Sequence, residues 1–349
     1  MKKFAINGRF VVRNLTGQER FAREIIQELD KLVKYGTIEL VIPQYAEEEK
    51  IPKYKNISIV RWGKCKSHMW EQIDFLTYIL YKRKIGINLC TTCPLLKPDI
   101  NTIHDINQSV NPQYFKSLYG RLSTIWHSLM QFSSFKWGKK ILTVSEFSKK
   151  EIIRVFHVKA SKILVLGNGW QHVNRIKEDL DIFKKNPILI PNEYFFAASS
   201  LTPQKNFQWI IEVAKKNTSE VFAIAGKKEK LTNTFGTQIP NNLLFLGYIT
   251  DSEMKALMQN CKAFIHPAFY EGFGIPPLEA MANGAKIIVS KTASLPEIFQ
   301  NSAYYIDPYN TNVDLKSLME PTIEPSSRVL DKYSWENEAK KLYNYLNSL

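Results

Sequence analysis

The chain lacks a hydrophobic run long enough to span a membrane, because none reaches the roughly 20 apolar residues that a spanning helix needs. Its first residues are also not expected to form an export signal. Its start, MKKFAINGRFVV, is basic, but Asn7, Arg9 and Arg13 interrupt the apolar core that a signal peptide requires. These residues are instead expected to form a first buried strand. We therefore expect a cytoplasmic protein.

Cysteine is scarce, with four in 349 residues. Cys90 and Cys93 form a C-x-x-C pair, but no second cysteine pair or histidine pair follows at zinc spacing. A thioredoxin-like site would place the pair at a helix start after a strand, whereas here Pro94 and a polar loop follow. We therefore expect ordinary packing for these cysteines, and neither a metal site nor a redox site.

Acidic residues are too few to balance the basic ones, and the formal net charge is +14. The imbalance lies entirely in residues 1–180, which hold 30 Lys and Arg against 16 Asp and Glu. An uneven charge of this kind indicates the type of partner that a protein binds, and it carries no information about the fold. An anionic membrane surface, a lipid-pyrophosphate acceptor and nucleic acid are the three candidates.

Apolar runs of strand length alternate with helical patterns along the whole chain, which predicts an α/β fold with parallel, doubly wound sheets. The length is sufficient for two such domains. Residues 171–192 are polar and charged and are expected to be a linker. The sequence thus predicts a first domain over 1–180, a second over 181–330, and a final helix over 331–349.

The segment from Phe264 to Pro308 carries the strongest chemical signal. It places Glu271 and Glu279 at the two ends of a loop–helix junction that contains EGFG and then two prolines. Glycines allow close approach of a ligand, and a helix N-terminus offers N–H donors and a positive dipole end to a phosphate. The junction therefore predicts a pyrophosphate site. Glu279, expected in the first helical turn, would accept from ribose hydroxyls, and Glu271 from those of a sugar.

These motifs resemble the retaining nucleotide-sugar glycosyltransferases of the GT-B kind, family 4 of the carbohydrate-enzyme classification (glycosyl transferases group 1). The family pattern P-S-x-x-E-G-F-G-L-P-x-x-E-A-M-A-x-G-x-P appears here with two departures, Ala268 and Lys286. Neither departure removes a group that the phosphate and ribose contacts need. The resemblance implies two Rossmann-like domains facing across a cleft, with the C-terminal helix crossing back to the N-terminal domain.

The resemblance also implies roles for residues outside this junction. Lys205, in SSLTPQKN, matches the family lysine that contacts the donor phosphates. The family often adds an arginine nearby, which this chain lacks, so the alternatives are a weaker phosphate contact or another cation such as Lys227 or Lys228. His104-Asp105 matches the family H-D that follows a strand of the first domain. The expected site residues are as follows: catalytic His104, Glu271 and Lys205; donor-binding Gly17, Ser200, Lys205, Gly226, Ile249, Glu271, Gly272, Phe273, Gly274, Ile275 and Glu279; acceptor-binding Arg20 and Asp105.

The stretch 121–140 has apolar residues at helical spacing together with basic residues. One interpretation is a helix that docks on an anionic membrane, and the other is a core helix with solvated lysines. The sequence does not separate the two, because it does not say which face is buried.

The expected function is that of a retaining glycosyltransferase, peripheral on the inner face of the cell membrane. No D-x-D pair stands where a divalent cation would be held, so metal-independent transfer without a cofactor is expected. GDP-mannose is the first expected donor, with dTDP-rhamnose or a UDP-hexose next. The expected acceptor is a lipid-pyrophosphate oligosaccharide of capsule or O-antigen synthesis, and nucleic acid is not expected. The alternatives are a nucleotide-sugar epimerase of the same fold or a basic nucleic-acid-binding protein.

Overall fold

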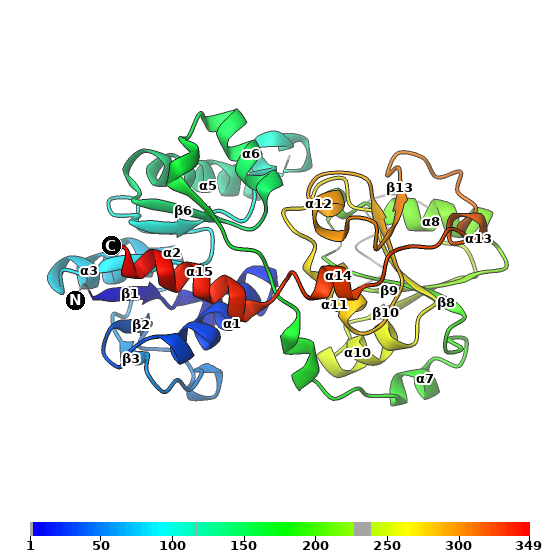
Figure 1. Ribbon diagram of the computed structural model, residues 1–349, viewed down its shortest axis with the longest axis horizontal. Helices are drawn as coiled ribbons and strands as arrows, with labels where there is room; N and C mark the ends of the chain where they lie inside the picture. Colours follow the sequence, from blue (N-terminus) through cyan, green and yellow to red (C-terminus); the bar gives the residue numbers. More distant parts are fainter. Residues whose placement is uncertain (1–2, 116, 201, 227–238) are drawn as a thin grey trace. The chain divides into compact units, whose positions relative to one another are not determined.

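The computed structural model describes residues 3–115, 117–200, 202–226 and 239–349. The chain forms two compact units, of which unit 1 comprises residues 1–169 and 335–349 and unit 2 comprises residues 170–334 (Figure 1). Each unit is built on one parallel sheet with helices along its connections. This confirms the α/β, doubly wound fold expected from the alternating pattern.

The sheet of unit 1 has the strand order β3-β2-β1-β4-β5-β6-β7. Its strands are short and mostly buried, as alternating apolar runs between helices predict. They are β1 (Phe4–Asn7), β2 (Ile38–Ile42), β3 (Ser58–Arg61), β4 (Ile85–Asn88), β5 (Ile100–Thr102), β6 (Lys140–Thr143) and β7 (Ile163–Val165). The helices of this unit are α1 (Gly17–Leu32), α2 (Ser67–Met69), η3 (Trp70–Phe75), α3 (Leu76–Tyr81), α4 (Asn107–Val110), α5 (Leu118–Trp137), α6 (Glu146–Phe156) and α15 (Trp335–Asn347).

The sheet of unit 2 has the order β10-β9-β8-β11-β12-β13. Its strands are β8 (Tyr194–Ala198), β9 (Val221–Ala225), β10 (Leu243–Gly247), β11 (Ala263–His266), β12 (Ile287–Ser290) and β13 (Tyr304–Ile306). Its helices are α7 (Asp181–Lys185), α8 (Phe207–Lys216), α10 (Asp251–Gln259), α11 (Ile275–Ala282), α12 (Leu295–Phe299), α13 (Leu315–Leu318) and α14 (Ser327–Leu330). Helix α8 buries Trp209 and Ile210 against the strands, so its apolar face closes one side of this core.

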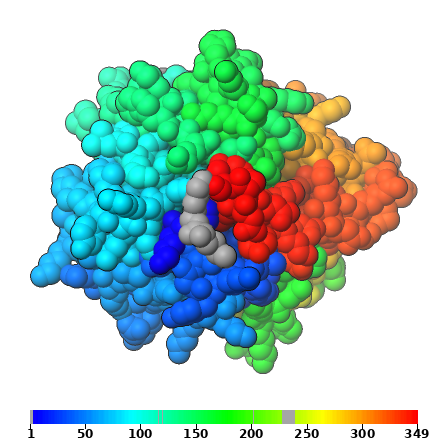
Figure 2. All heavy atoms as spheres, turned by 60° about the vertical axis from the view of Figure 1, so that its left-hand side comes forward, coloured from blue at the N-terminus to red at the C-terminus, as the bar shows by residue number. Residues whose placement is uncertain are grey.

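The C-terminal helix α15 belongs to unit 1, where it lies along α1. Trp335 and Leu342 are almost fully buried there, and the carboxylate of Glu338 accepts the Gly167 backbone N–H at 2.8 Å. Figure 2 shows this helix, in red, at the surface of unit 1 against the blue N-terminal part of the chain. The last helix therefore returns to the first unit, as the family resemblance implies.

The segment 171–192, expected to be a linker, packs on unit 2 instead. The Lys255 ammonium donates to the carbonyl oxygens of Val173 and Ile176, at 3.1 and 2.7 Å. Lys185 forms an ion pair with Glu253 at 2.9 Å. Polar composition suggested a solvated connection, but these polar groups bond to α10. The units accordingly divide after Gly169 and after Ser334, where the sequence suggested residues 180 and 330.

Candidate functional site

The candidate donor site of unit 2 lies where the strand order of its sheet reverses. Strands β8 and β11 are neighbours in the middle of the sheet, although two other strands separate them in the sequence. In parallel sheets, a ligand crevice opens beyond the carboxyl ends of the strands at such a reversal. Lys205 follows β8, and Glu271 follows β11. The topology therefore brings these two distant loops to one edge.

Lys205 and Glu271 form a direct ion pair. Their side chains are 15% and 13% exposed, and Nε2 of the buried His266 lies 3.4 Å from the same Glu271 oxygen. Burial opposes ionisation of Glu271, but the Lys205 charge and the His266 contact outweigh it and hold the pKa of Glu271 at about 2. Burial also lowers the pKa of His266. The site therefore presents an ionised carboxylate beside a cation.

The two loops are held together by side-chain bonds to backbone carbonyls. Asn206 adopts a left-handed conformation, with φ 55°, and its side-chain amide donates to the carbonyl oxygens of Pro267 and Pro308 at 3.1 and 2.9 Å. The Ser294 hydroxyl donates to the Glu271 carbonyl oxygen at 2.8 Å. These bonds fix the backbone of both loops. The side chains of Lys205 and Glu271 are therefore held in contact without any rearrangement of the loops.

Gly274 determines how helix α11 begins. Its φ of +100° is left-handed, and a Cβ atom there would lie 2.9 Å from Leu295 Cδ2, so another side chain at this position would be strained and crowded. The two prolines that follow Ile275 have no N–H. The donors at this helix start are therefore the backbone amides of Phe273, Gly274 and Ile275. Amides at a helix start can bind a phosphate.

The prediction that Glu279 lies in the first turn of this helix is wrong. Because Gly274 caps the helix, α11 begins at Ile275, and its first turn contains no acidic residue. Glu279 is the fifth helical residue, and its Oε1 lies 2.7 Å from Nε2 of His172. His172 is 2% exposed and orients this carboxylate. No local sequence pattern marks His172, which falls in the segment expected to be a linker.

The other expected donor residues of unit 2 lie at the same edge of the sheet. Ser200 is exposed, and its hydroxyl lies 3.4 Å from that of Thr202. The Gly226 N–H donates to the Gly247 carbonyl at 2.8 Å, and Ile249 is buried after the end of β10. Gly272 is buried, and the Phe273 ring meets the Tyr333 ring edge-on at 5.1 Å. Lys227 and Lys228 lie outside the described residues.

In unit 1, His104 follows β5 and is largely enclosed. Its Nε2 lies 3.1 Å from the Leu89 carbonyl oxygen, and the Phe21 ring meets it edge-on at 5.0 Å. A carbonyl only accepts, so Nε2 carries the proton and Nδ1 keeps its lone pair. Burial lowers the pKa of His104 to about 4, which leaves the ring neutral at physiological pH. The neighbouring Asp105 accepts the Asn107 N–H at 2.9 Å in a local turn.

The T-G-x-E-R segment starts α1 with a capping box. Thr16 is the N-cap, and its backbone N–H donates to Glu19 Oε2 at 3.1 Å. Gly17 is exposed as the first helical residue, and Arg20 is half-buried one turn after the cap, with its N–H donating to the Thr16 carbonyl. The capping box thus fixes where the Arg20 side chain leaves the helix.

Within residues 3–115, 117–200, 202–226 and 239–349, no three His, Cys, Asp or Glu side chains are grouped so as to hold a metal ion.

Sequence comparison relates the chain to known glycosyltransferases. Residues 178–321 match the family Glycosyl transferases group 1. The chain is 27% identical to the O-antigen chain mannosyltransferase RfbU of Salmonella typhimurium over 272 residues, which cover 74% of this chain and 72% of that protein. It is 26% identical to the O-antigen chain mannosyltransferase B of Escherichia coli over 290 residues, or 77% of this chain and 74% of that protein.

Among solved structures, Anabaena Alr3699/HepE in complex with UDP-glucose resembles the whole chain. The TM-score is 0.72 at 14% identity, and the match covers 100% of both chains. Two parallel-sheet α/β units of this kind constitute the GT-B fold. Unit 2 thus contains a glycosyl transferases group 1 domain, and the protein is a glycosyltransferase of the GT-B fold.

Proposed function

We propose that the protein transfers mannose from GDP-mannose to a lipid-linked oligosaccharide in cell-surface polysaccharide synthesis, with retention at the anomeric carbon and without a metal ion. The Lys205–Glu271 ion pair beside the start of α11 is the observation that carries this proposal. Two relatives named as O-antigen chain mannosyltransferases favour mannose. dTDP-rhamnose and UDP-hexoses are the next donors to consider.

The arrangement matches the charges that develop when the sugar leaves its donor. Negative charge grows on the leaving diphosphate, where the amides at the start of α11 and the Lys205 ammonium would stabilise it. Glu271 is ionised and would accept hydrogen bonds from sugar hydroxyls. Because Glu271 is already paired with Lys205, both groups are oriented before the donor arrives.

Two further groups complete the proposed donor contacts. Glu279, oriented by His172, would accept from both hydroxyls of the nucleotide ribose. His104 is neutral with a lone pair on Nδ1, so it would accept a hydrogen bond from the sugar during transfer without adding positive charge. Ser200, Gly226 and Ile249 would border the nucleotide. In unit 1, Gly17 would approach the donor phosphates, and Arg20 and Asp105 would contact the acceptor.

The donor is tested by incubating the protein, with EDTA and no added metal, with GDP-mannose, dTDP-rhamnose and several UDP-sugars in turn. We expect release of GDP from GDP-mannose, lost in Lys205→Ala and kept in Lys216→Ala, which removes an exposed lysine of the same unit. NMR of the transferred sugar would report retention. Absence of both release and nucleotide binding would contradict the proposal. Conversion to an epimeric nucleotide sugar without release would indicate an epimerase.

Replacing Glu279 with Ala should weaken GDP binding by about tenfold or more, because hydrogen bonds from ribose to a charged group would be lost. Calorimetric titration with GDP measures this. Glu279→Gln keeps an oxygen that His172 can contact. It therefore shows whether weaker GDP binding in Glu279→Ala comes from the lost ribose contact or from disorder of His172. Glu193→Ala, at an exposed acid of unit 2, is the control. Unchanged affinity in Glu279→Ala would rule out the ribose role.

The charge state of Glu271 has a consequence for acid stability. Its pKa is depressed from an ordinary value of 4.5 to about 2, so ionised Glu271 stabilises the folded state above pH 4.5. That contribution is lost as the pH falls through the folded pKa. Between pH 4.5 and about 2, the free energy of unfolding of Glu271→Gln should therefore fall less steeply than that of the wild type. Urea denaturation at several pH values measures this. Glu193→Gln should keep the wild-type slope, and an equal slope in Glu271→Gln would refute the pairing.

Helix α5 supports the proposed contact with a membrane surface. Leu118, Leu122, Ile125, Leu129 and Phe132 recur every three or four residues on one face and are 76, 58, 58, 46 and 55% exposed. The Lys136 ammonium lies 5.5 Å from the ring centres of both Phe132 and Trp137. No helix among the described residues combines the length and apolar character needed to cross a bilayer. The exposed face is instead suited to lie in the membrane interface.

Vesicle sedimentation tests this contact. We expect binding to phosphatidylcholine vesicles that contain phosphatidylglycerol, weaker binding without it, and release by salt. Ile125→Glu with Leu129→Glu should abolish binding. Leu180→Glu, at a leucine of unit 2 that is 55% exposed, should not. Binding that persists in the α5 double variant would contradict this part of the proposal.

A further inference from the structure

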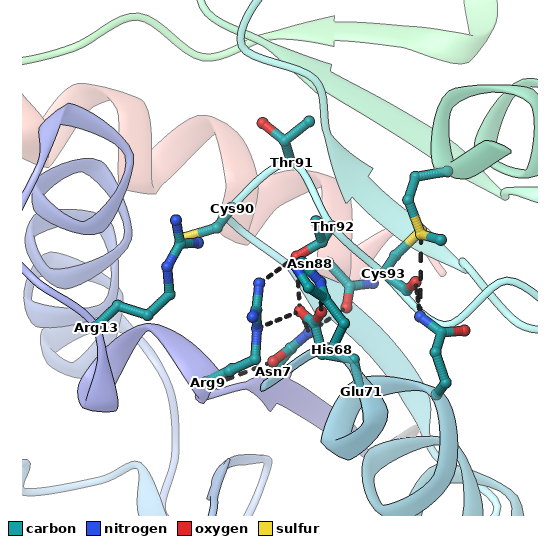
Figure 3. Close-up of polar contacts among 12 residues, drawn as sticks. Asn7, Arg9, Arg13, His68, Glu71, Asn88, Cys90, Thr91, Thr92 and Cys93 are labelled. Carbon is teal, nitrogen blue, oxygen red and sulfur yellow. Dashed lines mark hydrogen bonds and ion pairs between the residues drawn. The ribbon is translucent and has the colours of Figure 1, made fainter. Parts of the chain in front are cut away.

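A second buried ion pair lies in unit 1 at the corresponding reversal of strand order. In this sheet the order reverses between β1 and β4, which are neighbours. Arg9 follows β1, Thr92 follows β4, and Glu71 comes from the helical segment η3. Figure 3 shows the three side chains converging beyond the ends of these strands. The expected position of a ligand crevice in unit 1 is thus occupied by charged and polar groups.

Glu71 is the centre of this cluster. Its Oε1 accepts from Asn7 Nδ2 at 3.0 Å and from the Thr92 hydroxyl at 2.7 Å, and it lies 3.1 Å from Arg9 Nε. Arg9 also donates through Nη2 to Thr92 at 3.1 Å. The side chains of Arg9 and Glu71 are only 7% and 2% exposed. Burying two charges in this way carries a desolvation cost that pairing alone does not reliably repay.

Despite these contacts, the pair is not fully satisfied within the described residues. Arg9 Nε is close to Glu71 but makes no hydrogen bond of acceptable geometry. On the other side, Glu71 Oε2 lies 3.3 Å from His68 Nδ1. The Trp126 indole N–H, which can only donate, also points to that nitrogen at 3.2 Å. A nitrogen that accepts from Trp126 cannot donate to Glu71, so this carboxylate oxygen has room for another donor.

A small cavity opens onto these groups. Its volume is about 10 Å³, close to that of one water molecule, and it is lined by Asn7, Arg9, Phe10, Arg13, Glu71 and Cys90. Such a space admits one hydroxyl, either on a ring carbon or at the end of a hydroxymethyl group, but not a sugar ring. A hydroxyl can accept from a guanidinium and donate to a carboxylate at once.

The charges argue against an anion as the occupant. The Arg9 guanidinium is balanced by Glu71, and Arg13 is paired with Glu19 at 3.1 Å. Burial disfavours ionisation of Glu71, but the Arg9 charge and the hydrogen bonds from Thr92 and Asn7 lower its pKa, so it is ionised at neutral pH. A phosphate at this point would meet a carboxylate directly. A neutral polyol meets no such repulsion.

We propose that this pocket binds one hydroxyl or hydroxymethyl group of a neutral sugar ring of the acceptor, between Arg9 and Glu71, and that it determines which acceptor sugar is used. The inference rests on the proposed function in one respect, namely that the acceptor is an oligosaccharide. Unit 1 would then recognise the acceptor in the way that unit 2 is proposed to recognise the donor. In both units, a carboxylate and a cation are held together at the reversal of strand order.

Saturation-transfer NMR with a panel of methyl hexopyranosides, including methyl α-mannoside and methyl α-rhamnoside, tests the pocket in the full chain. We expect at least one glycoside to bind the wild-type protein. Cys90→Leu, which fills the pocket but leaves the ion pair, should weaken that binding by about tenfold or more. Arg9→Lys, which keeps the charge but removes the forked donors, should do the same. Cys65→Leu, the same change at another partly buried cysteine of unit 1, should bind like wild type.

GDP binding, measured on the same samples, separates the possible failures. If GDP binds all variants equally, the donor side is intact, and if their thermal unfolding matches that of the wild type, unit 1 is folded as well. Under that condition, the inference is overturned if no glycoside binds the wild type, if Cys90→Leu and Arg9→Lys bind as wild type does, or if inorganic phosphate displaces the bound glycoside. Failure of GDP to bind the wild type would instead count against the proposed function, while a glycoside signal sensitive to Cys90→Leu would still support the pocket.

Discussion

Every pairing between the described strands of the two sheets is parallel, and the arrangement of functional side chains depends on this constraint. Parallel strands end at the same edge, so the loops that follow them meet there regardless of their separation in sequence. Where the strand order reverses, the two neighbouring loops leave in opposite directions and open a crevice. Lys205 and Glu271 occupy this position in unit 2, and Arg9 and Thr92 occupy it in unit 1.

A mostly buried pair of opposite charges lies at each of the two reversals of strand order. Such a pair contributes little net stability, because desolvation of the two ions offsets their attraction, whereas loss of one partner costs about 3–5 kcal/mol. Stability alone therefore does not account for Lys205–Glu271 or Arg9–Glu71. A carboxylate and a cation fixed side by side suit the proposed recognition of polar ligands, because they present acceptors and donors whose orientation is already set.

The apolar face of α5 shows what a periodic sequence pattern cannot determine, namely which face of a helix is buried. The sequence showed apolar residues at helical spacing over 121–140, which is equally consistent with a core helix and with a surface helix. In the structure, Met130 is buried, whereas Leu122, Ile125 and Leu129 on the neighbouring face are exposed. Periodicity identifies the faces of a helix, but only the neighbouring elements determine which face is covered.

The sequence by itself determined the features that depend on local chemistry. Alternating apolar runs specified the parallel sheets, and glycine with proline after Glu271 specified a tight junction with a helix start. Contacts between distant segments required the tertiary structure. His172 lies 107 residues from Glu279, in a segment that looked like a linker. No local sequence pattern marks Glu71 as the partner of Arg9. The physical reason is that local sequence fixes backbone conformation, whereas the partner of a buried polar side chain is fixed by the order of strands in the sheet.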